Sequence, residues 1–300
     1  MTPLAGMVAA LLAFQSEASI VAVLPGSTRS AGLGGAGAAL VGDAGAVFAN
    51  PAGLATIRHL SVEASYEPYL AGTAVSAAAV ALRVGRVTWG FGAQTLDYGS
   101  EPEIVPDPAT GGRRGMPTGA AFHPYEALAV SSVVYRRGLL AFGVSAKYDR
   151  QQIGDMVSDA WAGDAGMAIA IFDIAAFGLS VQNLGGDFGA GARLPHRTRA
   201  GFTFNYTDPQ GAFRLLTTLE AQWTRDRAAV LIQGLEGGIV TGGVGLVGRI
   251  GYATRAAVTD ASRFTFGGGV VLGHLQMDYA FHGYQALGGG THRVGVQWTP

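Results

Sequence analysis

RSAGLGGAGAALVGDAGAVFANPAGLATIR, from Arg29 to Arg58, is unlike the rest of the chain. Between Arg29 and Arg58 its side chains are almost all small or apolar. The marked positions are a glycine cluster (Gly32, Gly34, Gly35), one acid (Asp43), one aromatic (Phe48) and the closing pair Asn50-Pro51. Proline pushes the preceding residue out of helical geometry. We therefore expect any helix built over residues 38–49 to stop at Asn50, whose short amide can satisfy backbone groups at a turn. The small side chains predict a thin segment that can pass through a confined space.

One alternative interpretation of this stretch is a dinucleotide-binding loop, because Gly32, Gly34 and Gly37 match the spacing G-x-G-x-x-G. That motif requires a strand, a tight turn and a helix inside a βαβ unit. The next two hundred or so residues show almost no helical periodicity, and Pro25 lies between the preceding apolar run and the glycines. We set the nucleotide-binding interpretation aside.

The composition narrows the class of protein. Charged residues make up only 14% of the 300 residues, glycine occurs 47 times, and the mean hydropathy is +0.28. After the N-terminus no run reaches the roughly 18 consecutive apolar residues that a membrane-spanning helix needs. A buried sandwich or a membrane β-barrel remains, since a closed barrel also satisfies its backbone in lipid. The net charge of -1 argues against nucleic acid as a partner, and the absence of cysteine excludes disulfides and thiolate metal sites.

The first residues are expected to be a targeting segment. Residues 1–22 contain an apolar run from Leu4 to Phe14, too short to span a bilayer, followed by the small residues Ser16, Ala18 and Ser19. No lysine or arginine precedes the apolar run, so this signal peptide is atypical. A buried strand or the start of a helix is the alternative.

From His59 onward the dominant hydrophobic period is two. For example, Trp89 and Phe91 alternate with Gly90 and Gly92. Such runs are close to ten residues long, as a tilted transmembrane strand requires. We count about fourteen of them in residues 59–300, an even number as bacterial barrels require. Minimal turns mostly alternate with longer links, above all Gly99 to Tyr125 and Asn183 to Pro195, which matches short periplasmic turns and long external loops. The sequence therefore predicts an all-β protein, a transmembrane antiparallel barrel with both chain ends in the periplasm.

Chemical motifs are scarce. The six histidines lack metal-ligand spacing, and no hydrolase, Walker or zinc motif is present. Asp155, Asp159 and Asp164 lack the pattern of a calcium loop. We expect no enzyme activity, no cofactor and no metal. The polar residues of the strands instead suit a network on the inner wall that pairs with itself and with the N-terminal segment: Glu63, Lys147, Asp149, Glu220, Arg249, Asp278 and Arg293.

Several segments resemble one known family. The glycine-rich opening and the Asn50-Pro-Ala-Gly-Leu54 close stand just before the first expected strand, and Gly143-Val-Ser-Ala-Lys-Tyr148 and Gly178-Leu-Ser-Val-Gln-Asn-Leu-Gly185 follow in order. Together they resemble the FadL-like barrels of the bacterial outer membrane, and within that group the PorV/PorQ family. The resemblance implies that residues 23–58 form a small plug inside the lumen, with Gly32, Gly34, Gly35, Asp43, Phe48, Asn50 and Pro51 as its marked residues.

The resemblance also implies a role. PorV/PorQ-like barrels are accessory or cargo-handling components of type IX protein secretion, so the expected partners are outer-membrane lipid, secretion-system components and secreted cargo. The alternatives are FadL-like passive transport of hydrophobic small molecules, with a hydrophobic ligand, and a purely structural barrel. A transporter should have a sizeable apolar pocket near the plug and an opening at a kinked strand. The small plug and the single long loop favour the accessory role.

Overall fold

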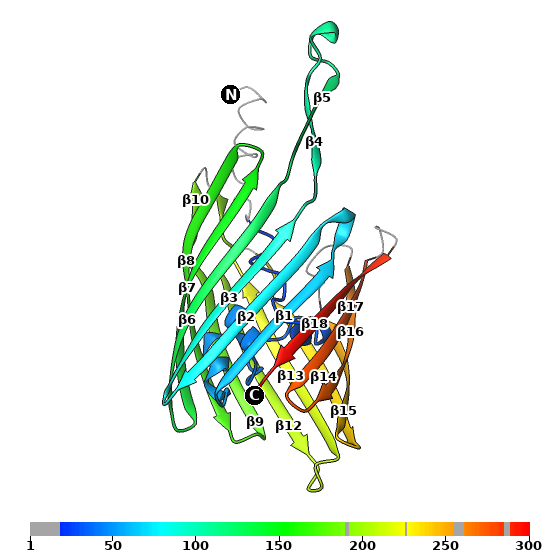
Figure 1. The fold of residues 1–300 in the computed structure, drawn as a ribbon. Helices are drawn as coiled ribbons and strands as arrows, with labels where there is room; N and C mark the ends of the chain where they lie inside the picture. The colour runs from blue at the N-terminus through cyan, green and yellow to red at the C-terminus, as the bar shows by residue number, and fades with distance from the viewer. Residues whose placement is uncertain (1–18, 190–191, 226, 255–260, 285–288) are drawn as a thin grey trace.

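In the computed structural model, fourteen antiparallel strands close into a barrel (Figure 1). The structure describes residues 19–300 apart from 190–191, 226, 255–260 and 285–288. In chain order the barrel strands are β1 (Leu60–Pro68), β2 (Ala74–Val84), β3 (Val87–Asp97), β6 (Tyr125–Arg137), β7 (Leu140–Ile153), β8 (Met156–Ile171), β9 (Ala175–Gly185), β12 (Arg197–Thr207), β13 (Phe213–Thr224), β14 (Val230–Thr241), β15 (Val244–Ala253), β16 (Ala261–Leu272), β17 (Leu275–Tyr284) and β18 (Gly289–Trp298). The predicted fold class and strand number are confirmed.

Two further pairs of strands lie in links for which the sequence predicted no strands. β4 (Glu101–Pro106) and β5 (Gly115–Phe122) form a hairpin that stands beyond one rim of the barrel, with the short turn η4 (Pro108–Thr110) at its tip (Figure 1). β10 (Asp187–Gly189) pairs with β11 (Ala192–Arg193). Nearly every residue of β4 and β5 is exposed, so neither strand has the buried face that produces a period of two.

The side chains of the barrel strands alternate between the two faces of the wall. Outward-facing residues such as Trp89, Phe91 and Val144 are about half exposed, at 45%, 50% and 61%, whereas their inward neighbours Gln94 and Lys147 are buried. An apolar outer face on a closed wall is the pattern of a transmembrane barrel, in which every backbone group is paired and lipid contacts the apolar band. The protein is accordingly a barrel of the bacterial outer membrane.

Residues between Ser19 and Arg58 occupy the lumen. Their regular elements are the short helix α2 (Thr28–Gly32) and the 3-10 turns η1 (Ala44–Phe48) and η2 (Pro51–Thr56); a further turn, η3 (Leu70–Gly72), joins β1 to β2. No helix among the described residues is long and apolar enough to cross a membrane. The helix allowed for residues 38–49 is present only as η1. It does end before Asn50, whose side-chain Oδ1 accepts a hydrogen bond from the Ala52 N–H at 3.1 Å.

The described chain enters the lumen from the rim that carries the β4–β5 hairpin. The Ser19 hydroxyl donates to Asp149 and the Val21 N–H to Glu126, and these acids lie near the ends of β7 and β6 on that side. Ser19 therefore lies at the same rim as the segment Gly99 to Tyr125, so the predictions of a periplasmic N-terminal end and an external 99–125 loop do not hold together. The predicted signal peptide, 1–22, falls outside the described residues except for Ser19 to Ala22.

Candidate functional site

One side of the plug packs tightly against the barrel, and we call this contact the packed face. Val47 and Leu54 are fully buried there against β2, β3, β6 and β7. Gly90 and Gly92 on β3 make this possible, because a Cβ atom at either position would collide with Leu54 or with Val47 and Phe48. Wall glycines therefore let the plug approach the strands closely, as glycine does wherever another backbone comes near.

The Asn50-Pro51 turn is fixed within the packed face. Asn50 Nδ2 donates to the Ala38 carbonyl at 2.7 Å and to the Met167 carbonyl of β8 at 3.2 Å. Two wall glycines, Gly143 and Gly166, face this turn without room for a Cβ. The amide of Asn50 therefore bonds to the plug at Ala38 and to the wall at Met167, in addition to the predicted bond within the local turn.

The opposite side of the plug forms ion pairs with the barrel wall, and we call it the charged face. Arg29 of α2 lies between Asp43 of the plug, at 3.2 Å, and Glu236 of β14, at 2.9 Å. Arg249 of β15 contacts Glu236 at 2.7 Å and Asp278 of β17 at 2.6 Å. These side chains are at most 12% exposed, so salt in the solvent screens them little.

A second carboxylate contact lies between the plug and β13. One oxygen of Glu220 accepts hydrogen bonds from the Gly37 and Ala38 N–H groups, each at 2.7 Å. Its other oxygen accepts from Arg199 Nε at 2.7 Å, and Arg199 also donates to the Gly35 carbonyl at 2.6 Å. Successive backbone N–H groups that point at one oxygen form an anion-binding concavity.

The other polar residues predicted for the lumen are also inside it, but they bind different partners. Lys147 pairs with Asp164 at 2.8 Å, within the wall. Glu63 accepts from the Thr28 N–H at 3.3 Å. Arg293 pairs with Glu67 at 2.6 Å and donates to the Pro25 carbonyl. Asp149 binds Ser19, as described above. The seven therefore belong to several separate contacts and not to one network.

The predicted plug glycines contact the charged side of the lumen. Gly34 adopts φ +76°, a left-handed conformation that favours glycine, and its N–H donates to Thr265 Oγ1 at 2.9 Å. Gly32 lies against Gly267 of β16, and Gly35 accepts the hydrogen bond from Arg199. Phe48 completes the set, since its carbonyl accepts from Gln182 Nε2 at 2.8 Å while its ring borders a cavity.

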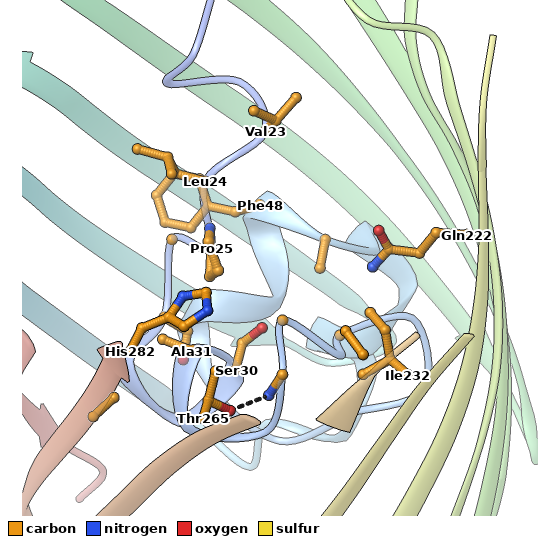
Figure 2. Close-up of a pocket in the computed structure, with 18 of the residues that line it drawn as sticks. Val23, Leu24, Pro25, Ser30, Ala31, Phe48, Gln222, Ile232, Thr265 and His282 are labelled. Atoms are coloured by element: carbon orange, nitrogen blue, oxygen red, sulfur yellow. Dashed lines mark hydrogen bonds between the residues drawn. The ribbon is translucent and has the colours of Figure 1, made fainter. Parts of the chain in front are cut away.

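A cavity of about 980 Å³ lies beside the plug and is bordered by the plug and by residues of strands β12 to β18 (Figure 2). Leu24 and Phe48 project into it from the plug, and Ile232 from β14 (Figure 2). On sequence grounds a small plug and only one long loop to build a pocket favour the accessory role, but the pocket forms without that loop. Because the plug is small and packs against β2 to β9, it cannot fill the wide lumen of a fourteen-stranded barrel, and the unfilled space is the cavity.

Five charged residues of these contacts were absent from the predicted lumen set: Arg29, Glu67, Asp164, Arg199 and Glu236. A signal for Glu236 was available, because the alternation in β14 places it on the same inward face as Ile232. Arg29 is the first residue of the stretch quoted above and lies opposite Glu236 only after the barrel closes. Spacing along the chain carries no sign of a contact between residues so far apart.

Comparisons with known proteins bear on the fold. No family model and no curated protein matches the chain. Among solved structures it is similar to the CymD monoaromatic hydrocarbon channel (12% identity, TM-score 0.58, 94% of this chain and 99% of that one). It is also similar to the toluene transporter TbuX of Ralstonia pickettii (13%, 0.56, 93% and 99%) and to a Pseudomonas aeruginosa FadL homologue (10%, 0.56, 91% and 98%). The fold is thus that of FadL-like barrels, and the finer resemblance to PorV/PorQ proteins stays a prediction.

Proposed function

We propose that the protein is a passive outer-membrane channel for small, uncharged hydrophobic molecules, which bind in the cavity beside the plug. The observation that carries the proposal is the cavity itself, bordered by Leu24, Phe48 and Ile232 and closed on one side by the plug. A concave, partly apolar space of several hundred Å³ or more is the usual form of a small-molecule site.

Two of the five arginines that border the cavity are already paired with acids, which favours a neutral ligand near them. Arg199 is engaged by Glu220, and Arg293 by Glu67, so these cations are already neutralised by acids of the barrel wall. An anionic ligand would have to compete with these buried pairs, whereas an apolar one only displaces water.

An irregular strand beside the cavity supports a route out of it. The β16–β17 register shifts between Ala261 and Thr265, and the pairing of β16 with β15 ends at Phe264. Ala261 and Thr265 both border the cavity. β3, in contrast, pairs continuously with both neighbours over its whole length. A hydrophobic molecule could leave sideways into the membrane where the ladder is interrupted.

The accessory role in type IX secretion is the weaker candidate. Two of the structures with this fold are a monoaromatic hydrocarbon channel and a toluene transporter, and their functions favour transport for this chain. The proposal assigns no catalytic step to any residue.

The test is a substitution that fills the cavity with a larger side chain. Ala31 borders it from the plug, and Ala31→Phe should reduce binding of toluene at least about tenfold, because the ring takes the space of the ligand. Toluene binding is measured by displacement of a fluorescent naphthylamine dye from the purified protein, and uptake by cells that express it. Ala93→Phe, on the outward face of β3, is the matched control and should bind as the parent protein does. Equal binding by both variants and the parent would refute the cavity as the site.

A further inference from the structure

Two buried carboxylates at the end of the lumen near the β4–β5 hairpin lack a cation. Asp149 is 0% exposed and Glu126 is 7% exposed. The Ser19 hydroxyl donates to Asp149 Oδ2 at 2.6 Å, and Glu126 accepts from the Val21 N–H at 3.0 Å and the Tyr98 hydroxyl at 2.7 Å. Within the described part of the chain, Asp149 Oδ1 has no hydrogen-bond partner and neither acid forms a salt bridge.

Among the described residues, most other carboxylates of the inner wall are paired with a cation; Glu63, which accepts from the Thr28 N–H, is the exception. Glu67, Asp164, Glu220, Glu236 and Asp278 each contact an arginine or a lysine. A buried carboxylate without a cation is costly. Asp149 and Glu126 therefore call for a positive group that the side chains around them do not supply.

The backbone nitrogen of Ser19 is placed to supply it. Nitrogen and Oγ of one serine are separated only by Cα and Cβ, so the nitrogen lies close to the acid that binds the hydroxyl. Ser19 also has φ +77°, which is unusual for a residue other than glycine. A chain that begins at Ser19 has no φ angle at that residue, so the cost of this conformation disappears if the preceding peptide bond is cut.

The sequence before Ser19 fits such a beginning. Ser16 and Ala18 are small residues at the third and first positions before it, and they follow the apolar run Leu4 to Phe14. This is the A-x-A-like pattern at which a signal peptidase cuts. A cut after residue 22 would instead remove Ser19 and the fully buried Val21, leaving both acids without their present partners.

We propose that a signal peptidase cleaves the Ala18–Ser19 bond and that the new α-ammonium group of Ser19 is bound by Asp149 and Glu126. Water hydrolyses the peptide bond, so the leader leaves with the Ala18 carboxylate and the mature chain keeps the Ser19 amine, which is protonated in the lumen. The anchored end then holds Val23 to Pro25 along the cavity. This inference is independent of what the cavity binds.

The first test is the N-terminal sequence of the protein purified from outer membranes. We expect Ser-Ile-Val-Ala-Val. A chain that begins at Val23, or one that retains Met1, overturns the proposal.

The second test is the reactivity of the α-amine toward an acetylating reagent near pH 8, read by mass spectrometry. The assay is clean because Lys147, the only lysine in the sequence, is 2% exposed. Acetylation of the folded protein should be at least about tenfold slower than after unfolding, since a bound ammonium is held in its unreactive charged form. Glu126→Gln and Asp149→Asn should each speed it, and Glu103→Gln, on the exposed β4–β5 hairpin, should not.

If the two variants do not fold, the comparison of folded and unfolded parent protein decides alone. An amine that reacts equally fast in both states refutes the carboxylate pair as its site, even in a chain that begins at Ser19.

Discussion

The packed face and the charged face hold the same plug by different physical means. On the packed face, Val47 and Leu54 lie against wall glycines with no space left. On the charged face, Arg29 reaches Glu236 next to a smaller apolar cluster that includes Leu33, and this side of the lumen also contains the cavity. Apolar packing requires contact over an area, whereas an ion pair fixes a position with a few atoms. A plug attached by ions on one side can therefore stay in place beside an open space.

The largest expected effect comes from deleting the plug, which removes the packed face and the charged face together. Deletion of residues 26–57 should leave a conducting pore, because a barrel of this size is too wide for wall side chains alone to fill it. Single-channel recording in planar bilayers measures this, with the intact protein closed or nearly so. Equal conductance of the two proteins would show that the stretch is not a plug.

Loss of the Arg29 ion pairs of the charged face should have the next largest effect. Arg29→Met removes the cation between Asp43 and Glu236 and should lower the free energy of unfolding by about 3–5 kcal/mol, because a buried charge loses its partner. Urea unfolding in detergent measures it. Arg193→Met, in an exposed pair with Asp187 at 3.9 Å, should cost below about 1 kcal/mol. Similar losses for the two would show that burial does not strengthen the Arg29 contacts.

Leucine-to-alanine substitutions at a fully buried and at a partly open position of the plug compare close packing with packing beside the cavity. Leu54→Ala, at a fully buried position of the packed face, should cost about 2–5 kcal/mol through the cavity that it leaves. Leu24→Ala, at a half-buried position on the edge of the same cluster and beside the existing cavity, should cost less, about 1 kcal/mol, because fewer contacts are lost. Urea unfolding again gives both values, and a Leu24 variant as unstable as the Leu54 variant would remove the distinction.

The smallest expected effect concerns a single methyl group. Gly178 of β9 faces the Ala38 carbonyl with no room for a Cβ, so Gly178→Ala should cost about 1–3 kcal/mol. Gly237→Ala, where nothing lies within 4 Å of the added atom, is the matched control on β14. The midpoint of heat-modifiable migration on gels compares the two, and unchanged midpoints for both would contradict close packing at Gly178.

The sequence was informative about the wall and less so about the lumen. The period of two predicted fourteen strands and the inward position of Glu63, Lys147 and Asp149, because alternation is a local property of a strand. It gave no sign of the β4–β5 hairpin, whose strands are exposed on both faces. It also misjudged the plug, since small side chains indicate that a segment is thin but not that it lies against one side of a wide bore.

The sequence by itself thus determined the barrel, its apolar outer face and the existence of an unusual N-terminal stretch, because each depends on neighbours along the chain. Only the tertiary structure decided which charges meet. Arg29 and Glu236 are 207 residues apart in sequence and 2.9 Å apart in space. Closure of β1 on β18 and the register of every strand between them set that contact. The cavity has the same origin, because it is the difference between the width of the closed barrel and the volume of the plug inside it.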